Sequence, residues 1–414
     1  MLKILKQNLM FRRLASSLFI SELGSWFSYM LLIVMTYTKT ETLMTTMGIA
    51  LFLSIGSLVG GALAGVIIED KNPAKVIIIT NIASALLISS LFWLPNTIQV
   101  YYVAAFAISF VSSFRTPAFN KYIVSVVQED DLMEANGTFQ STRELVKILG
   151  PGLAATVLGV LPESQQSVGF IIDAATYILA SCMFIGISLG KIEPINIEKK
   201  VKVKQSFWSR WKEGLSPIKS PIVISVLVMY VCIMLGIAGV DVTFTAHVDK
   251  SGYKAEFVGY ILGALSTGMI LTSIFGSKYI KKLPLALQLG GGTLGLGLFY
   301  AGIGFSTNIY LMMASAFALG VFNSGFNMSA STFWQTAIPY DQLGRFFSTI
   351  TSFLSSVTLL GMGINGLIGT ISTPQFVIML CGGLILLSGL VSIFIIMSVN
   401  KTDENKVEPA KQTL

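Results

Sequence analysis

The chain has 414 residues, of which 53% are hydrophobic and only 12% are charged, and its mean hydropathy is +0.74. A soluble core needs far fewer apolar side chains, so this composition excludes a soluble protein. It predicts an all-α membrane protein, because backbone groups in lipid must be hydrogen-bonded within their own helix. The net charge is +7, and the positive residues are concentrated in a few loops beside apolar segments. Orientation of the chain in the membrane explains this distribution, so no nucleic-acid partner is expected.

The apolar residues gather in twelve runs, each long enough to cross a hydrocarbon layer about 30 Å thick. The predicted membrane-spanning helices cover residues 14–37, 43–68, 75–94, 98–121, 138–161, 167–190, 220–246, 256–279, 284–305, 308–333, 345–371 and 375–399. The first run follows a basic start but is too long for a signal-peptide core, so we interpret it as the first span. The predicted domains are an N-terminal six-helix bundle at 1–190, a linker at 191–219, a C-terminal six-helix bundle at 220–400 and a disordered tail at 401–414.

Positive charge indicates which loops face the cytoplasm. The linker carries eight Lys or Arg residues, and the basic N-terminal segment and the cluster Lys278, Lys281 and Lys282 fall on the same side of the predicted spans. Because cytoplasmic loops are enriched in Lys and Arg, both termini are predicted to be cytoplasmic in a bacterial-type inner (plasma) membrane. The chain is expected to be a monomer whose partners are a small-molecule substrate, protons and membrane lipids.

A constant offset of 211 residues relates similar residues in the two blocks of spans. The pairs are Gly65 and Gly276, Asp130 and Asp341, Leu132 and Leu343, Gly150 and Gly361, and Gly152 and Gly363. Transporters are often built from duplicated halves. The offset therefore indicates two six-helix bundles related by a pseudo-two-fold axis along the membrane normal.

The first span carries a deep carboxyl group. Glu22 lies about eight residues, roughly 12 Å by helical rise, into this span. An ionisable group in lipid is costly and usually faces a partner or a watery cavity, so Glu22 is the first candidate for proton binding. Trp26 and Tyr29 follow on the same span and are candidates for lining an adaptable apolar substrate cavity, although packing alone would also explain them.

The loop after span two begins with small residues and continues with charged ones, at Gly61, Gly65, Asp70, Lys71 and Lys75. Small residues allow two helices to approach closely. A glycine, an aspartate and then basic residues at this place resemble the signature loop of the major facilitator superfamily. Lysines replace the usual arginines here, and Asn72-Pro73 interrupts the basic run. An ordinary polar loop with helix-capping residues is the alternative.

Two further segments resemble the macrolide-efflux branch of that superfamily. They are residues 114–120 with 129–132, at the end of span four, and residues 340–345, at the start of span eleven. The resemblance implies that Asp70 pairs with Arg115 near Gly344 and Arg345, as a charge latch that holds the cytoplasmic side closed when the pocket faces outward. A helix N-terminus attracts a carboxylate, which suits this arrangement. Arg115 snorkelling to lipid headgroups is the alternative.

Span five contains Gly150, Pro151 and Gly152, which are similar to the glycine-proline motif of antiporters in this superfamily. Pro151 removes a backbone hydrogen bond and is expected to bend the helix. Ala154 and Ala155 stand where the fuller motif has glycines. The resemblance implies antiport, and a purely structural kink is the alternative.

Charged residues also lie in the inner half of span five and in span six. Arg143, Glu144 and Lys147 occupy neighbouring faces of span five. Lys147 is a candidate counter-charge to Glu22, and a local pair of Lys147 with Glu144 is the alternative. Asp173, in span six, is the second candidate for proton binding.

These features predict a secondary active transporter that exports a bulky amphipathic molecule by proton-coupled alternating access. The family resemblance implies a drug such as a macrolide, and siderophore export or proton-coupled uptake are alternatives. The three cysteines lie singly inside apolar runs, so no metal site and no cofactor are expected. The sequence has no nucleotide-binding loop or hydrolase motif, which makes an intramembrane enzyme, a receptor or an ATP-driven pump the less favoured classes.

Overall fold

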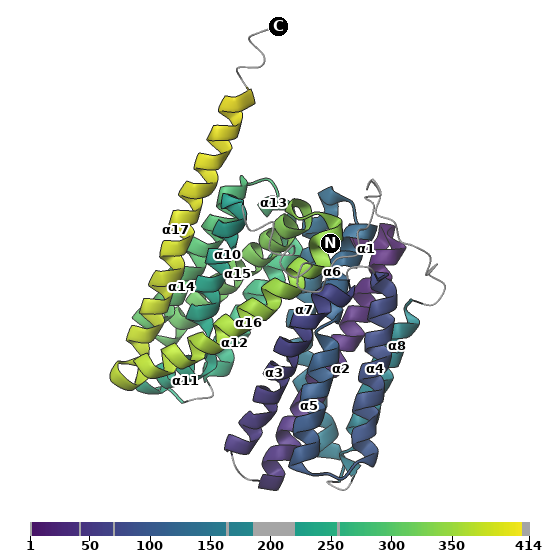
Figure 1. Ribbon diagram of the computed structural model, residues 1–414. Helices are drawn as coiled ribbons and strands as arrows, with labels where there is room; N and C mark the ends of the chain where they lie inside the picture. Colours follow the sequence, from purple (N-terminus) through teal and green to yellow (C-terminus); the bar gives the residue numbers. More distant parts are fainter. Residues whose placement is uncertain are drawn as a thin grey trace. The chain divides into compact units, whose positions relative to one another are not determined.

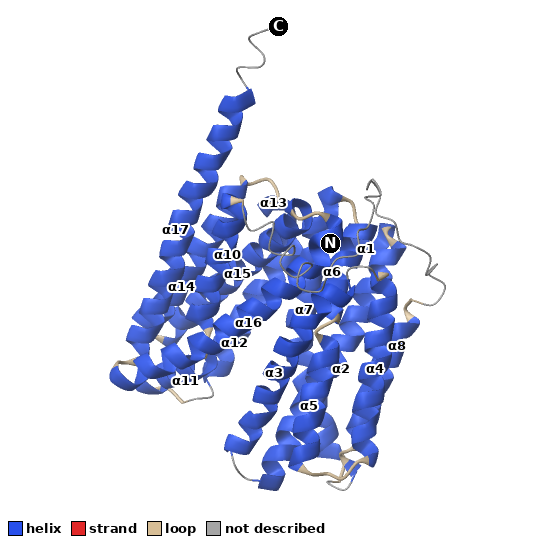
Figure 2. Cartoon of the chain, viewed as in Figure 1, coloured by secondary structure: helices blue, strands red, loops and turns tan. Residues whose placement is uncertain are grey.

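The computed structural model describes residues 2–40, 43–68, 71–162, 165–184, 220–254 and 257–407. Within these ranges the chain is almost entirely helical and has no strand (Figure 1, Figure 2). Among the described residues, eight helices are long and apolar enough to cross a membrane, and Val168–Cys182 and Pro221–Ile237 are shorter apolar helices. The predicted all-α membrane fold is confirmed.

The helices of the first half follow the predicted spans closely. They are α1 (Leu2–Gln7), α2 (Leu9–Thr40), α3 (Leu43–Ile68), α4 (Pro73–Trp93), α5 (Ile98–Ser112), α6 (Arg115–Val126), the short 3₁₀ helix η1 (Glu129–Asp131), α7 (Leu132–Val160) and α8 (Val168–Cys182). The predicted span at 98–121 is divided into α5 and α6. Pro117 explains the division, because proline has no N–H and is tolerated only in the first turn of a helix.

The second half has more interruptions. Its helices are α10 (Pro221–Ile237), α11 (Val240–Lys250), α12 (Phe257–Leu271), the π-helix η4 (Thr272–Gly276), α13 (Ser277–Ile280), the π-helix η5 (Leu287–Gly291), α14 (Gly292–Phe305), α15 (Ile309–Ala337), α16 (Tyr340–Ile371) and α17 (Pro374–Val407). The predicted span at 220–246 is divided where Gly239 adopts a left-handed φ of 76°, which favours glycine. The helix α17 continues to Val407, into the segment predicted as a disordered tail.

The chain divides into two compact units. The first unit contains Met1–Leu215 and Trp334–Phe353, and the second contains Ser216–Phe333 and Leu354–Leu414. The boundaries fall inside α15 and α16, so the last turn of α15 and the first part of α16 belong to the first unit.

The core of the first unit forms where α2 packs against α7 and α8, and where α4 packs against α8 (Figure 1). One apolar cluster includes Phe11, Tyr122 and Phe139, and a second includes Leu31 and Phe170. In the second unit α17 packs against both α10 and α14. These buried faces hold the helices that carry the polar residues described below.

Two of the glycine pairs at the 211-residue offset have matching surroundings. A Cβ at Gly150 would meet the α2 backbone at Phe27, and a Cβ at Gly361 would meet the α10 backbone at Leu235. Gly152 and Gly363 both face open space, with no atom within 4 Å of an added Cβ. Helix α7 therefore packs on α2 as α16 packs on α10, which supports the internal repeat.

Candidate functional site

A buried arginine is the centre of the polar site in the first unit. Arg115 is the first residue of α6, and only 4% of it is exposed. Its Nη2 lies 3.9 Å from Glu22 Oε1 on α2, and the Glu22 side chain is 22% exposed. The structure thus brings together Arg115 and Glu22, which the sequence assigned to separate roles.

Three further side chains surround the Arg115 guanidinium. Its Nη1 donates to Asn81 Oδ1 on α4 at 3.4 Å, and its Nη2 donates to Ser25 Oγ on α2 at 3.5 Å. Its Cζ lies 5.4 Å from the ring centroid of Tyr177 on α8. The hydroxyls of Ser25 and Tyr177 are 2.8 Å apart, so the ring is tied to α2 as well. A buried cation with these partners is a paired charge and does not snorkel to the membrane surface.

Asp173, the second predicted proton site, is fully buried on α8. The Ser28 hydroxyl donates to Asp173 Oδ2, and the Thr176 hydroxyl donates to Oδ1 at 3.0 Å. An added Cβ at Gly24 would overlap this carboxyl group and the Thr176 hydroxyl, so only glycine allows α2 to approach α8 here. Asp173 therefore joins α2 to α8 next to the Arg115 site.

One face of α4 offers polar atoms that have no protein partner among the described residues. Asn81 and Ser84 are fully buried and lie one helical turn apart. The Asn81 Nδ2 and the Ser84 Oγ have no hydrogen-bond partner in the described part of the chain. Because buried polar groups are normally satisfied, this face is suited to bind an ordered water molecule.

The predicted aromatic residues lie next to the charged site on α2. The rings of Trp26 and Tyr29 pack edge to face, with centroids 5.7 Å apart. Trp26 also lies where Gly150 of α7 meets α2. Helix α7 is continuous through Pro151, and the glycine before the proline allows the close contact.

The charged residues of span five form a pair of their own. Lys147 Nζ lies 2.8 Å from Glu144 Oε1, with Glu144 buried and the Lys147 side chain 45% exposed. Arg143 is half-buried on the same helix. Of the two roles considered for Lys147, the local pair with Glu144 is the one that the contacts favour, and the cation near Glu22 is Arg115.

The signature loop combines an exposed basic surface with a helix cap. Lys71 and Lys75 are exposed, and Asn72 Oδ1 accepts from the Ala74 N–H at 2.9 Å to cap α4. Asp70 lies outside the described residues, so the predicted pair with Arg115 stays a prediction.

The first part of α16 packs against α3 within the first unit. A Cβ at Gly65 would lie 3.1 Å from the Arg345 Cα and 2.9 Å from the Ser348 Cβ. The Ser348 hydroxyl donates to the Gly61 carbonyl, and Gly344 faces Ile68. The small residues of α3 therefore provide the surface on which the start of α16 rests, as the close-packing role of Gly65 predicts.

An amide cluster, which the sequence did not reveal, fixes the end of α15 in the same unit. Gln335 Nε2 donates to Asn120 Oδ1 and to Asn136 Oδ1 at 3.2 Å each. Asn136 Nδ2 donates to Gln335 Oε1 at 2.8 Å. Lys121 lies over the Tyr340 ring, 5.4 Å from its centroid. An uncharged amide within an apolar run is less conspicuous in a sequence than a carboxyl group. The three amides come from α6, α7 and α15, which become neighbours only when the chain folds.

Asn81, Ser25 and Tyr177 were also absent from the sequence prediction. Neutral polar residues are common in membrane helices, and no spacing links α2, α4 and α8 before they pack. One available signal is a mostly apolar helix that carries a single amide, as α4 does at Asn81 over residues 76–88. Among the described residues, no group of three or more His, Cys, Asp or Glu side chains is placed to hold a metal ion.

The sequence profile of the Major Facilitator Superfamily matches this chain over residues 14–291 and 227–413. Macrolide efflux protein A of Streptococcus pyogenes is 22% identical over 342 residues, which cover 77% of this chain and 81% of that protein. Macrolide efflux protein A of Enterococcus faecalis is 21% identical over 337 residues, which cover 76% of this chain and 100% of that protein.

Solved structures with the same fold include an outward-facing bacterial homologue of the iron transporter ferroportin. It has a TM-score of 0.72 and 14% identity, over 95% of this chain and 99% of that chain. The E. coli fucose:proton symporter FucP has a TM-score of 0.69 and 16% identity, over 92% of this chain and 98% of that chain. With a family profile that spans most of its length and the helical fold that these transporters share, the chain is a multi-pass membrane transporter that belongs to the Major Facilitator Superfamily.

Proposed function

We propose that this chain exports bulky amphipathic small molecules, such as macrolides, by proton-coupled alternating access. The observation that carries the proposal is the ion pair of Glu22 with the buried Arg115. Both curated relatives are named as macrolide efflux proteins, which supports the substrate class and the direction of transport.

The pair gives a physical basis for coupling. With Glu22 ionised, its carboxylate is the main compensation for the charge of Arg115, and the buried Asp173 carboxyl group contributes less. A proton that binds Glu22 removes that compensation, and an uncompensated buried charge costs several kcal/mol. Arg115 and the helices that hold it must then rearrange, so protonation favours a different conformation.

The substrate cavity is proposed to begin beside this pair. Trp26 and Tyr29 lie one and two turns along α2 from Glu22, and they offer aromatic surface for a bulky ligand. The unpaired polar atoms of Asn81 and Ser84 offer hydrogen bonds on the α4 side. A mostly apolar wall with a few polar groups is the usual composition of a small-molecule site.

The cellular setting follows from the charge distribution of the sequence. We propose a bacterial plasma-membrane location with both termini in the cytoplasm, and the bundles at 1–190 and 220–400 as the two halves that move. The basic linker at 191–219 connects them on the cytoplasmic side.

Flux into vesicles tests the direction and the coupling ion. Purified chain is reconstituted in liposomes, and uptake of radiolabelled erythromycin, a macrolide, is followed under an imposed pH gradient. An antiporter accumulates the drug when the vesicle interior is acidic, because protons leave as the drug enters. Accumulation only with an acidic exterior would identify a symporter, and no accumulation with either gradient would contradict the proposal.

Glu22→Gln tests the proposed proton site. Because glutamine keeps the size of the side chain but cannot bind a proton, gradient-driven flux should fall to the level of protein-free vesicles. Exchange of labelled for unlabelled erythromycin without a gradient should survive. Glu129→Gln, on the exposed η1 turn, is the matched control and should behave as the unmodified chain. Normal gradient-driven flux in Glu22→Gln would exclude Glu22 as the coupling site.

A further inference from the structure

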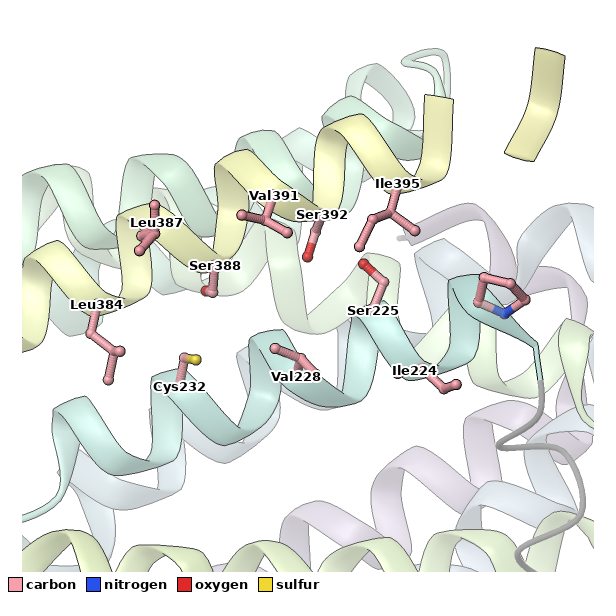
Figure 3. A pocket seen from close by; sticks show the side chains of 11 residues that line it. Ile224, Ser225, Val228, Cys232, Leu384, Leu387, Ser388, Val391, Ser392 and Ile395 are labelled. Carbon is pink, nitrogen blue, oxygen red and sulfur yellow. The ribbon is translucent and has the colours of Figure 1, made fainter. Parts of the chain in front are cut away.

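A groove runs along the outside of the second unit between α10 and α17 (Figure 3). It has a volume of about 480 Å³, within the range of small-molecule sites. Its rim consists of apolar side chains that are partly exposed, including Val228 at 46% and Leu387 at 59%. Both helices are apolar membrane segments, so the medium that reaches this rim is hydrocarbon.

The floor of the groove carries three serines, and the hydroxyl of one of them, Ser388, already donates to the Ile385 carbonyl. Ser225 of α10 and Ser392 of α17 lie there, each 2% exposed, and both hydroxyls point into the space between the helices (Figure 3). The Ser225 Oγ has no hydrogen-bond partner among the described residues. A buried hydroxyl in a membrane helix normally donates to a neighbouring carbonyl, so this one is available to a group in the groove.

The length of the groove matches one leaflet of a bilayer. Its α10 wall runs from Pro221, the first residue of the helix, to Cys232. By helical rise this distance is about 16 Å, close to half of a hydrocarbon layer about 30 Å thick. Ser225 lies about 6 Å below the helix start by the same rise, near the depth of the boundary between headgroups and acyl chains.

The sequence before α10 is basic. Lys219 stands two residues before Pro221, and Arg210 and Lys212 precede it. Basic residues next to a membrane helix attract anionic lipid headgroups. The expected occupant of the groove therefore combines an anionic headgroup, a hydrogen-bond acceptor below it and a long apolar chain.

We propose that the groove between α10 and α17 binds one acyl chain of an anionic diester phospholipid, with the Ser225 hydroxyl donating to the ester carbonyl. The chain lies along Val228, Leu387 and Leu384 toward Cys232. This site is separate from the Glu22–Arg115 pair and does not depend on the direction of transport.

Photolabelling of the full chain in vesicles tests the proposal. The vesicles contain phosphatidylethanolamine, phosphatidylglycerol and a phosphatidylglycerol with a diazirine in one acyl chain, and labelled peptides are identified by mass spectrometry. The peptides of α10 and α17 that line the groove should be labelled several-fold more strongly than the exposed face of α14. Leu387→Trp fills the groove and should remove this excess. Leu298→Trp, at an α14 residue that is 56% exposed, is the matched control and should leave it unchanged.

Competition by unlabelled lipids tests the role of Ser225. A diester phosphatidylglycerol should displace the probe better than a diether analogue, which lacks the carbonyl, by about two- to tenfold for one hydrogen bond. Ser225→Ala should abolish this difference without disturbing the fold. The proposal would be overturned if the groove peptides were labelled no more strongly than equally exposed residues on other helices. Equal competition by the diester and the diether lipid would also overturn it. Displacement of the probe by erythromycin instead of lipid would assign the groove to the transport substrate.

Discussion

Arg115 shows how a cation is accommodated inside a membrane-spanning bundle. A charged side chain within the membrane is costly, and it persists where partners are supplied. Its contacts to Asn81, Ser25 and Glu22 lie between 3.4 and 3.9 Å, so no single hydrogen bond fixes the guanidinium. The face of the Tyr177 ring packs against the guanidinium and limits its movement in that direction. The Tyr177 ring, Asn81 and Ser25 position the guanidinium, and the Glu22 carboxylate compensates its charge.

The ring and the hydroxyl of Tyr177 can be separated by mutation. Tyr177→Phe keeps the aromatic face under Arg115 and loses the hydroxyl, which contacts Ser25 and also interacts with Arg115, at about 0.5–1.5 kcal/mol for each contact. Tyr177→Leu also loses the cation–π interaction. Gradient-driven flux should therefore be close to normal in Tyr177→Phe and strongly reduced in Tyr177→Leu. If the two variants are equally impaired, the hydroxyl and not the ring positions Arg115.

Gly24 is required by the contact of α2 with the Asp173 carboxyl group. In Gly24→Ala the new methyl group overlaps this carboxyl and the Thr176 hydroxyl, so a buried hydrogen bond is lost, at about 1–3 kcal/mol. The melting temperature of the purified protein should fall. Gly152→Ala, where an added Cβ meets open space, should leave it unchanged or raise it, because alanine favours the helix over glycine. A similar shift in both variants would contradict the proposed contact.

At the scale of helices, glycines set how closely α14 and α17 approach in the second unit. Gly290 of η5 and Gly297 and Gly304 of α14 recur every seven residues, and Gly382 and Gly389 do so on α17. An added Cβ at Gly382 would lie 2.6 Å from the Ala301 N and 2.8 Å from the Gly297 carbonyl oxygen. A repeat of seven residues keeps the small residues on one face of each helix, so the two backbones come into direct contact.

Adjacent glycines of α17 give a matched pair of variants for this contact. Gly382→Val forces side-chain atoms into the α14 backbone and should destabilise the protein by about 1–3 kcal/mol or more. At Gly383, one residue further, an added Cβ has no neighbour within 4 Å, so Gly383→Val should change stability little. Thermal unfolding in detergent measures both. Equal melting temperatures for the two variants would show that the α14–α17 pair does not need this close approach.

At the scale of the whole molecule, the segment Trp334–Phe353 is the most informative part of the chain. It packs within the first unit through the Gln335 amide cluster and through Ser348 on Gly61, although the helices that contain it continue into the second unit. Under the proposed alternating access, this segment has to leave α3 and α7 during each cycle. The amide cluster and the Ser348 contact are neutral and can separate without exposing a charge, whereas Arg345 of the same segment is only 4% exposed and would be uncovered.

An engineered disulfide tests whether this separation is part of transport. A Cβ at Gly61 would lie 3.7 Å from the Ser352 Cβ, inside the range of about 3.5–4.5 Å found in disulfides. The double variant Gly61→Cys with Ser352→Cys should form the bond on oxidation and lose erythromycin flux, and reduction should restore it. Each single variant is a control and should be insensitive to oxidant. Full flux in the oxidised double variant would show that the segment stays with α3 throughout the cycle.

Much of the fold was predictable because a chain that crosses lipid needs long apolar runs whose backbone groups are hydrogen-bonded within each helix. Runs of apolar residues place the helices, and the prediction failed locally where backbone chemistry intervenes, at Gly239 and before Pro117. Both failures have a visible cause in the sequence, since a glycine and a proline mark the two breaks. The π-helices η4 and η5 leave no such mark.

The sequence by itself determined the helical membrane fold, the resemblance to the superfamily and the candidate charges Glu22, Asp173 and Arg115, because a charge within an apolar run is conspicuous. Only the tertiary structure decided their partners. Arg115 lies beside Glu22, Asn81 and Tyr177 because α2, α4, α6 and α8 pack together, and Lys147 pairs with Glu144 on its own helix. Hydrophobicity fixes each helix separately, whereas the pairing of polar groups depends on which helix faces meet.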